Sequence, residues 1–189
     1  LCELKIDGLA LNLRYERGRL VTAATRGDGR VGEDVTENVR LIPGIPQRLA
    51  GENHPELVEV RGEGFFTPAD FAALNAFQQA AGDRLFANPR NTTAGTLKLQ
   101  DPKIVAKRRL QNYIYTLQAE ELPTRSQFGN IMQCQEWGFR TPDPAKRFIE
   151  QTDSLEGIMN FIAHWDKARH DLDIAIDGVV IKVDSTDLQ

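Results

Sequence analysis

Charged and apolar residues alternate strictly at the start of the chain, where residues 2–8 read C-E-L-K-I-D-G. Successive side chains of a β-strand point to opposite faces, so this pattern predicts a strand with Glu3, Lys5 and Asp7 on one face. A lysine between two carboxylates, followed by a glycine, is typical of a reactive amine on a rigid strand, and we expect Glu3 and Asp7 to hold it charged. The alternative is a solvated strand face with an ordinary salt bridge.

The composition is that of a globular protein. The chain has 189 residues, of which 41% are hydrophobic and 26% are charged, enough for about one large domain with its own core. No apolar stretch reaches the length of a membrane span, so we expect no membrane partner. Cys2 and Cys134 lack the spacing of a zinc site, and no metal site is predicted within the chain. Two cysteines favour a reducing, cytoplasmic location.

Positive charge is concentrated in one segment. The net charge of −4 argues against a nucleic-acid partner, but residues 84–109 carry seven Lys or Arg against a single acid, Asp101. A local basic patch can neutralise phosphates whatever the overall sign of the charge. The alternative is a solvated basic helix face.

The order of predicted elements gives an α+β class, with largely antiparallel β-sheets flanked by helices in one domain over residues 1–189. Strands are expected at 2–8, 9–16, 19–25, 57–62, 112–117 and 174–183. Helices are expected at 67–81, at 126–137 and after a Thr152 cap. In the third helix we expect an apolar stripe to face the core, formed by Leu155, Ile158, Met159, Ile162 and Trp165.

Two further segments carry charge in a pattern suited to a nucleotide. In the sequence E-V-R-G-E at 59–63 the charged residues share one strand face, and the carboxylate of Glu63 can accept two ribose hydroxyls. The segment N-P-R-N at 88–91 places Arg90 between two amides, where its guanidinium suits bidentate phosphate recognition. The alternatives are a structural ion pair at 59–63 and a capping turn at Asn88 or Asn91.

The last predicted strand contains a lysine in an apolar run. Lys182 follows Val179-Val180-Ile181, and a buried lysine is costly unless it meets an anion. Regular alternation would place Asp177 and Lys182 on opposite faces, and Gly178 would permit a bulge that realigns them. On the preceding strand, either Tyr113 or Tyr115 could stack on a base, although core packing is the more frequent use of a tyrosine.

Five motifs taken together resemble the adenylation (nucleotidyltransferase) domain of the bacterial NAD⁺-dependent DNA ligases, from Leu1 to about Val183. They are, in order, C-E-L-K-x-D-G, A-T-R-G-D-G, E-V-R-G-E, N-P-R-N and D-G-V-V-I-K. K-x-D-G alone is shared with ATP-dependent ligases and RNA-capping enzymes, and the full set is far more specific. The resemblance implies the nucleotidyltransferase fold and a three-step reaction. Lysine–AMP forms from NAD⁺, AMP moves to the 5′-phosphate of a nick, and the strand is sealed in DNA replication and repair.

The resemblance also implies a role for each matching residue. The catalytic residues would be Lys5, the nucleophile that takes AMP, together with Asp7 and Lys182. The nucleotide would be bound by Glu3 at the adenine amino group, Tyr115 stacked on adenine, Glu63 at the ribose, Arg26 near ribose and phosphate, Lys182 at the α-phosphate and Asp177 beside it. DNA would be gripped by Arg90 and Lys98, of which Lys98 stands where many relatives have arginine.

The implied cofactors are NAD⁺ and Mg²⁺ or Mn²⁺, with zinc only in a downstream module outside these residues. The implied partners are NAD⁺, AMP and nicked double-stranded DNA. We further expect a monomer in the bacterial cytoplasm, associated with the nucleoid. The domain is expected to be incomplete at both ends and inactive in NAD⁺ turnover alone. The alternatives are an ATP-dependent ligase or capping-type nucleotidyltransferase, and a non-catalytic nucleotide- or DNA-binding module.

Overall fold

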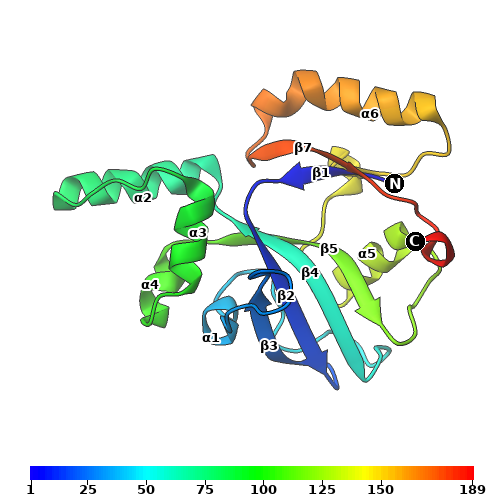
Figure 1. Ribbon diagram of the computed structural model, residues 1–189, viewed down its shortest axis with the longest axis horizontal. Helices are drawn as coiled ribbons and strands as arrows, with labels where there is room; N and C mark the ends of the chain where they lie inside the picture. The colour runs from blue at the N-terminus through cyan, green and yellow to red at the C-terminus, as the bar shows by residue number, and fades with distance from the viewer.

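Two antiparallel sheets form the centre of the protein in the computed structural model, which describes residues 1–189 (Figure 1). The larger sheet has the strand order β3-β2-β4-β5, and the smaller has the order β6-β1-β7. The strands of the larger sheet are β2 (Leu9–Glu16), β3 (Arg19–Thr25), β4 (Leu57–Phe65) and β5 (Gln111–Ala119). Those of the smaller sheet are β1 (Cys2–Ile6), β6 (Ile149–Glu150) and β7 (Ile176–Ile181). The predicted mixture of helices and antiparallel sheets is confirmed.

Six α-helices surround the sheets: α1 (Thr36–Val39), α2 (Pro68–Ala81), α3 (Pro89–Leu97), α4 (Pro102–Lys107), α5 (Gln127–Glu136) and α6 (Leu155–Ala168). Their starts follow from the local sequence. The Thr67 hydroxyl accepts a hydrogen bond from the Asp70 N–H at 3.0 Å, and Gly82 ends α2 in the left-handed conformation. α2 and α3–α4 form an arm at one end of the molecule (Figure 1). No helix is long and apolar enough to cross a membrane.

The larger sheet buries one face and leaves the other polar, as the alternation in β2 predicts. Leu13 and Tyr15 have no exposed surface and belong to a core of 20 buried residues that also includes Val39 of α1 and Cys134 of α5. Residues at the alternate positions of β2, beginning with Ala10, face the opposite way, and Ala10 lines the cavity described below. One face of the larger sheet is therefore covered by the core and the helices α1 and α5, and the opposite face, with Ala10, borders the cavity.

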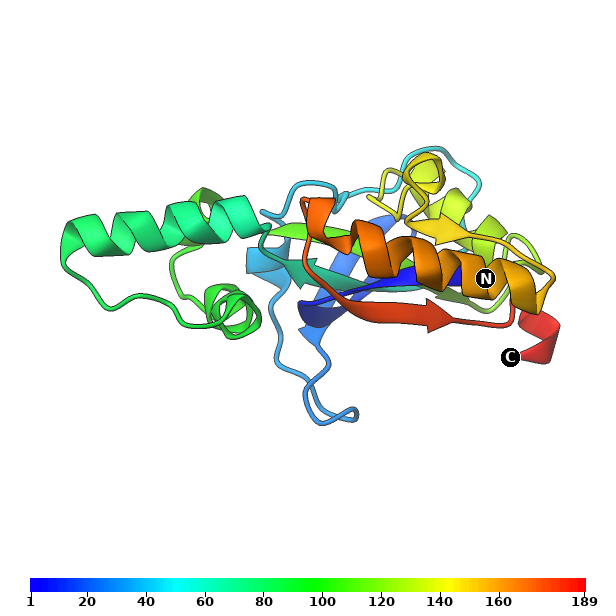
Figure 2. The ribbon, with the colours of Figure 1, turned by 90° about the horizontal axis from the view of Figure 1, so that it is seen from above.

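The smaller sheet contains a bulge. The β1–β7 register runs from Leu4 opposite Val179 to Lys5 opposite Gly178, and then to Ile6 opposite Ile176. Asp177 is thus an extra residue without a partner on β1, which is the irregularity that Gly178 was expected to permit. Helix α6 lies over this sheet and packs against it through Phe161 and Trp165 (Figure 2).

Three local predictions were wrong. Helix α6 begins after Ser154, whose hydroxyl accepts from the Gly157 N–H at 3.1 Å, and not after Thr152. Leu155 and Met159 are 74% and 54% exposed, because the buried face of α6 is set by Phe161 and Trp165. The last strand is shorter than the predicted 174–183 and ends at Ile181, one residue before Lys182.

We predict that Gly62 is required by close packing in the larger sheet. A Cβ at this position would lie 2.5 Å from the Tyr113 carbonyl oxygen and 2.6 Å from Ile114 Cδ1. Gly62→Ala should lower the free energy of unfolding by about 1–3 kcal/mol, the usual cost of overpacking. Gly95→Ala is the matched control, because nothing lies within 4 Å of its added Cβ in α3. Urea unfolding of both variants tests this, and equal stabilities would contradict it.

Candidate active site

The two sheets and helix α3 enclose a cavity of about 620 Å³. Eight of the ten site residues predicted from the sequence line it: Glu3, Lys5, Arg26, Glu63, Arg90, Lys98, Tyr115 and Lys182. The other two, Asp7 and Asp177, form ion pairs with residues of the wall. The structure therefore brings together residues that are up to 179 positions apart in the chain.

Lys5 is paired with Asp177. Its Nζ donates to both carboxylate oxygens of Asp177, at 2.7 and 2.8 Å, and the Lys5 side chain is 51% exposed. The prediction that Glu3 and Asp7 hold this lysine was wrong, because each has a different cationic partner. The bulge at Asp177 explains the outcome, since it places the carboxylate opposite the exposed end of β1.

Glu3 and Lys182 form a second, more buried pair. Lys182 Nζ donates to the two Glu3 oxygens at 3.1 and 3.0 Å and to the Tyr115 carbonyl at 3.1 Å. Glu3 is only 3% exposed, and this burial raises the pKa of its carboxyl group, while Lys182 acts in the opposite direction. Three acceptors thus satisfy the lysine that the sequence places in an apolar strand.

Among the carboxyl groups, Glu63 has the pKa that differs most from its ordinary value. Burial raises the pKa of Glu63 to about 7, although Arg90 and Lys5 nearby act to lower it. The group therefore changes charge near neutral pH. It lies on β4 directly opposite Tyr113 of β5 and lines the cavity.

The two tyrosines of β5 have different surroundings. Tyr113 stacks on Phe65 with ring centroids 5.7 Å apart and meets Phe148 edge-on at 6.4 Å. Tyr115 has no aromatic partner, and the Nζ of Lys182 lies 5.2 Å from its ring centroid. Burial raises the pKa of Tyr115 to about 12, so its hydroxyl stays protonated at neutral pH. Both rings line the cavity, and only that of Tyr113 is engaged in aromatic packing.

Three of the seven basic residues at 84–109 form ion pairs, namely Arg90, Lys98 and Arg109. Asn88 caps α3 by accepting from the Asn91 N–H at 3.1 Å, which confirms the capping interpretation of this turn, and Arg90 in the first turn lies 3.8 Å from Asp7. Lys98, at the end of the same helix, forms an ion pair with Glu33. Both residues therefore belong to the cavity wall as well as to the basic segment.

Several lining residues were missed by the sequence analysis: Thr25, Gly27, Asp28, Glu33, Pro142 and Val180. Val180 could have been found, because it lies two residues before Lys182 and shares its strand face. Gly27 and Asp28 belong to the A-T-R-G-D-G motif and lie beside Arg26. Pro142 follows α5 and carries no signal in the sequence.

A tyrosine-lined cavity with an exposed lysine and several ion-paired basic side chains defines a protein suited to bind a phosphate-bearing nucleotide. The comparison with known sequences agrees. Residues 1–189 match the family described as NAD-dependent DNA ligase adenylation domain, and the chain belongs to this family.

Curated relatives support the same assignment. The chain is 51% identical to a DNA ligase of Synechococcus sp. strain CC9605 over 99% of its length, and 47% identical to one of Frankia casuarinae over 100%. It is 46% identical to a DNA ligase of Parabacteroides distasonis over 97% of its length. The matched part is 26–27% of each relative, so the chain spans about a quarter of their length.

The raised pKa of Glu63 predicts a pH-dependent stability. Below the unfolded value of about 4.5 the group is protonated in both states, and above about 7 it is charged in both. Between these values the folded state holds more protons, so Glu63 makes the folded chain progressively less stable as pH rises. The free energy of unfolding of Glu63→Gln should therefore rise relative to the unmodified chain from pH 5 to pH 8.

Urea unfolding at pH 5, 6, 7 and 8 measures this difference. Glu52→Gln is the matched control, because it removes the same charge from an exposed loop. A difference between Glu63→Gln and the unmodified chain that does not change with pH would show that the free site does not perturb Glu63.

Proposed function

We propose that the chain is the adenylating part of an NAD⁺-dependent DNA ligase, with the nucleotidyltransferase fold, and that Lys5 is its nucleophile. The observation that carries this proposal is the position of Lys5, exposed in the cavity with its Nζ 2.7 Å from the Asp177 carboxylate. Membership of the adenylation-domain family supports it, and disfavours both an ATP-dependent enzyme and a non-catalytic module.

In the proposed first step the Lys5 amine attacks the α-phosphorus of the adenylate half of NAD⁺. A P–N bond forms, the P–O bond of the pyrophosphate breaks, and nicotinamide mononucleotide leaves with the electron pair. Lysine attacks only as the free amine, so one proton must leave its ammonium group beforehand. Asp177 is the carboxylate within hydrogen-bond distance and is our candidate acceptor of that proton.

The remaining cavity residues are proposed to bind the nucleotide. Tyr115 would stack on adenine, Glu3 would accept from its amino group, and Glu63 would accept from the ribose hydroxyls. Lys182 and Arg26 would stabilise the charge on the phosphate oxygens. Lys182 is held by Glu3 in the free protein, so its reach to the phosphate requires a change of rotamer along its flexible stem.

A divalent cation is part of the expectation for this family. No three or more His, Cys, Asp or Glu side chains are grouped so that they could hold a metal ion. Mg²⁺ in nucleotide sites commonly takes one or two carboxylates together with phosphates and water. We therefore propose that Mg²⁺ enters with the nucleotide, near Asp7, Glu63 or Asp177, and neutralises phosphate charge there.

The later steps are proposed to take place on nicked double-stranded DNA. AMP would move from Lys5 to the 5′-phosphate, and the 3′-hydroxyl would displace AMP to seal the strand. Asp7 would hold Arg90 by the ion pair already described, while Arg90 and Lys98 bind the phosphates of the nick. A monomer in the bacterial cytoplasm, associated with the nucleoid, is the setting we propose for this activity.

The nucleophile is tested by covalent labelling. In a chimaera in which residues 1–189 replace the matching segment of the Synechococcus relative, adenylate-labelled NAD⁺ should label the protein, and Lys5→Ala should abolish the label. Lys5→Arg should fail as well, because guanidinium stays protonated. The adduct should be acid-labile and base-stable, as a phosphoramidate is. Persistent labelling of Lys5→Ala would show that another residue carries AMP.

The adenine site is tested by AMP binding to the 189-residue chain. Tyr115→Ala should weaken binding by about 1–3 kcal/mol, the scale of base–aromatic stacking, and Tyr115→Phe should be much milder because it keeps the ring. Tyr113→Phe is the control, since Tyr113 packs against Phe65 and Phe148 through its ring. Calorimetric titration measures all three, and normal affinity in Tyr115→Ala would remove Tyr115 from the site.

A further inference from the structure

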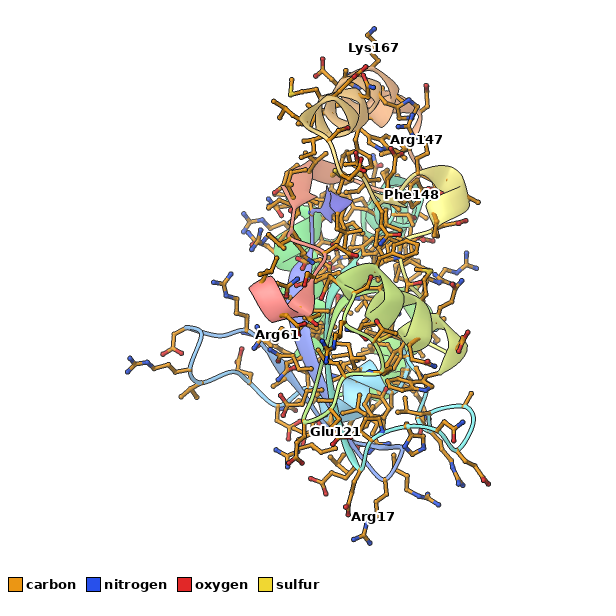
Figure 3. The ribbon with its side chains drawn as sticks, turned by 90° about the vertical axis from the view of Figure 1, so that its right-hand side faces the viewer. Arg17, Arg61, Glu121, Arg147, Phe148 and Lys167 are labelled. Carbon is orange, nitrogen blue, oxygen red and sulfur yellow. The ribbon has the colours of Figure 1, made fainter.

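The loop at 26–34, between β3 and α1, projects from the body of the protein. Figures 2 and 3 show it, in light blue, reaching away from the sheets in two perpendicular views. All nine of its residues are exposed. Its base belongs to the cavity wall, because Arg26, Gly27, Asp28 and Glu33 line the cavity. The tip, at 29–32, lies beyond that wall.

The loop has a fixed conformation. The Asp28 carboxylate accepts from the N–H groups of Arg30 and Val31, both at 2.8 Å, and these bonds lower the pKa of Asp28. At the base, the Thr25 N–H donates to the Glu33 carbonyl at 3.0 Å. Gly27 has φ +54°, and a Cβ there would lie 1.8 Å from the Val31 carbonyl oxygen, so only glycine allows this close approach. The tip is therefore presented in one shape before any partner arrives.

The loop carries two arginines and three acids. Its three acids each have a partner: Asp28 within the loop, Glu33 with Lys98, and Asp34 with the Thr36 N–H and hydroxyl at 2.9 and 2.6 Å. Arg26 and Arg30 form no ion pair. The side chain next to Arg30 is Val31, an apolar residue that is 74% exposed. Within the tip at 29–32, Arg30 is thus the one charged side chain, and it lies beside the apolar Val31.

We propose that this tip, with Arg30 and Val31, docks on the duplex beside the nick. The proposal rests on the proposed function, because a 5′-phosphate that reaches the cavity brings its duplex past the loop. Arg30 would contact a backbone phosphate, and Val31 would pack against the sugars or base edges of the minor groove. Apolar side chains next to arginine are a recurrent means of contacting that groove.

Duplex DNA fits this surface better than a protein does. A stable protein interface involves about 20–30 residues on each partner, which is more than a projecting loop of nine residues offers by itself. Contacts to a nucleic acid need no such area, because each phosphate contact gains free energy from counterion release. Arg26 at the cavity wall and Arg30 at the tip, neither of them in an ion pair, are consistent with that mode of binding.

The test compares two loop variants with two controls of equal chemistry on α6. Val31→Ser is matched by Leu155→Ser, because Leu155 is also 74% exposed. Arg30→Ala is matched by Lys167→Ala, since Lys167 is exposed, forms no ion pair and lies at the far end of the molecule (Figure 3). Binding of the 189-residue chain to a nicked duplex is measured by fluorescence anisotropy from 50 to 200 mM salt, and binding of AMP by calorimetry.

Arg30→Ala should reduce the slope of log K against log salt by about one, as loss of one phosphate contact does. Val31→Ser should weaken DNA binding by about three- to tenfold with the slope unchanged, because it removes apolar contact only. The controls should bind DNA as the unmodified chain does, and all four variants should bind AMP normally.

Loop variants that bind nicked DNA like their controls would overturn the loop proposal and leave the proposed function intact. Weaker AMP binding in the loop variants, with DNA binding unchanged, would also overturn it, because the loop would then serve the nucleotide. An unmodified chain that binds AMP but no nicked DNA at any salt concentration would remove the DNA partner from the proposed function, and the loop proposal with it.

Discussion

The antiparallel pairing of β1 with β7 is the contact on which the cavity depends. It joins two strands at opposite ends of the chain, and places Lys5 beside Asp177 and Glu3 beside Lys182. Asp177 and Lys182 are five residues apart, so regular alternation would turn them to opposite faces of the sheet. Because Asp177 is an extra residue in the strand, it shifts the alternation by one position and turns its side chain to the same face as Lys182. A single bulge thus brings both ion pairs to the same cavity.

These pairs leave the cavity close to neutral before a ligand arrives. Five cationic side chains line it, and four of them are held by carboxylates, in the pairs Lys5–Asp177, Lys182–Glu3, Arg90–Asp7 and Lys98–Glu33. Only Arg26 has no acidic partner. The carboxylates avoid the cost of partly buried, unpaired cations in the free protein. A bound phosphate must therefore compete with them, and we infer that Arg26 is the cation most readily available to it.

Much of this arrangement could be predicted from local sequence patterns. Alternation in β2 and β4 identified which residues face the core, and the hydroxyl cap at Thr67 fixed the start of α2. Asn88 was expected only as a capping turn, and in the structure it begins helix α3. The start of α6 was predicted wrongly because two nearby hydroxyl residues can each cap a helix. Thr152 and Ser154 are both competent caps, but in the structure the Thr152 hydroxyl accepts from the Ser154 N–H at 3.3 Å and the Ser154 hydroxyl accepts from the Gly157 N–H, so the helix starts after Ser154.

The partner of Lys5 could not be predicted, because it depends on strand register between distant segments. Local alternation offered Glu3 and Asp7, and only the β1–β7 pairing reveals that Asp177 is nearer. A second bulge acts in the same way on β5, where Tyr115 is an extra residue between Ile114 opposite Gly62 and Thr116 opposite Arg61.

Both irregularities lie at the wall of the cavity, and a glycine adjoins or faces each of them, Gly178 in one case and Gly62 in the other. Bulges re-aim side chains next to functional sites, and glycine is the residue that permits the local bend or close approach. The glycine inside the charged strand motifs D-G-V-V-I-K and E-V-R-G-E therefore accompanies a change in register, whereas the third shift, at Val21 between β3 and β2, has no glycine beside it. In this chain the glycine marks the two positions where a side chain departs from simple alternation to reach the site.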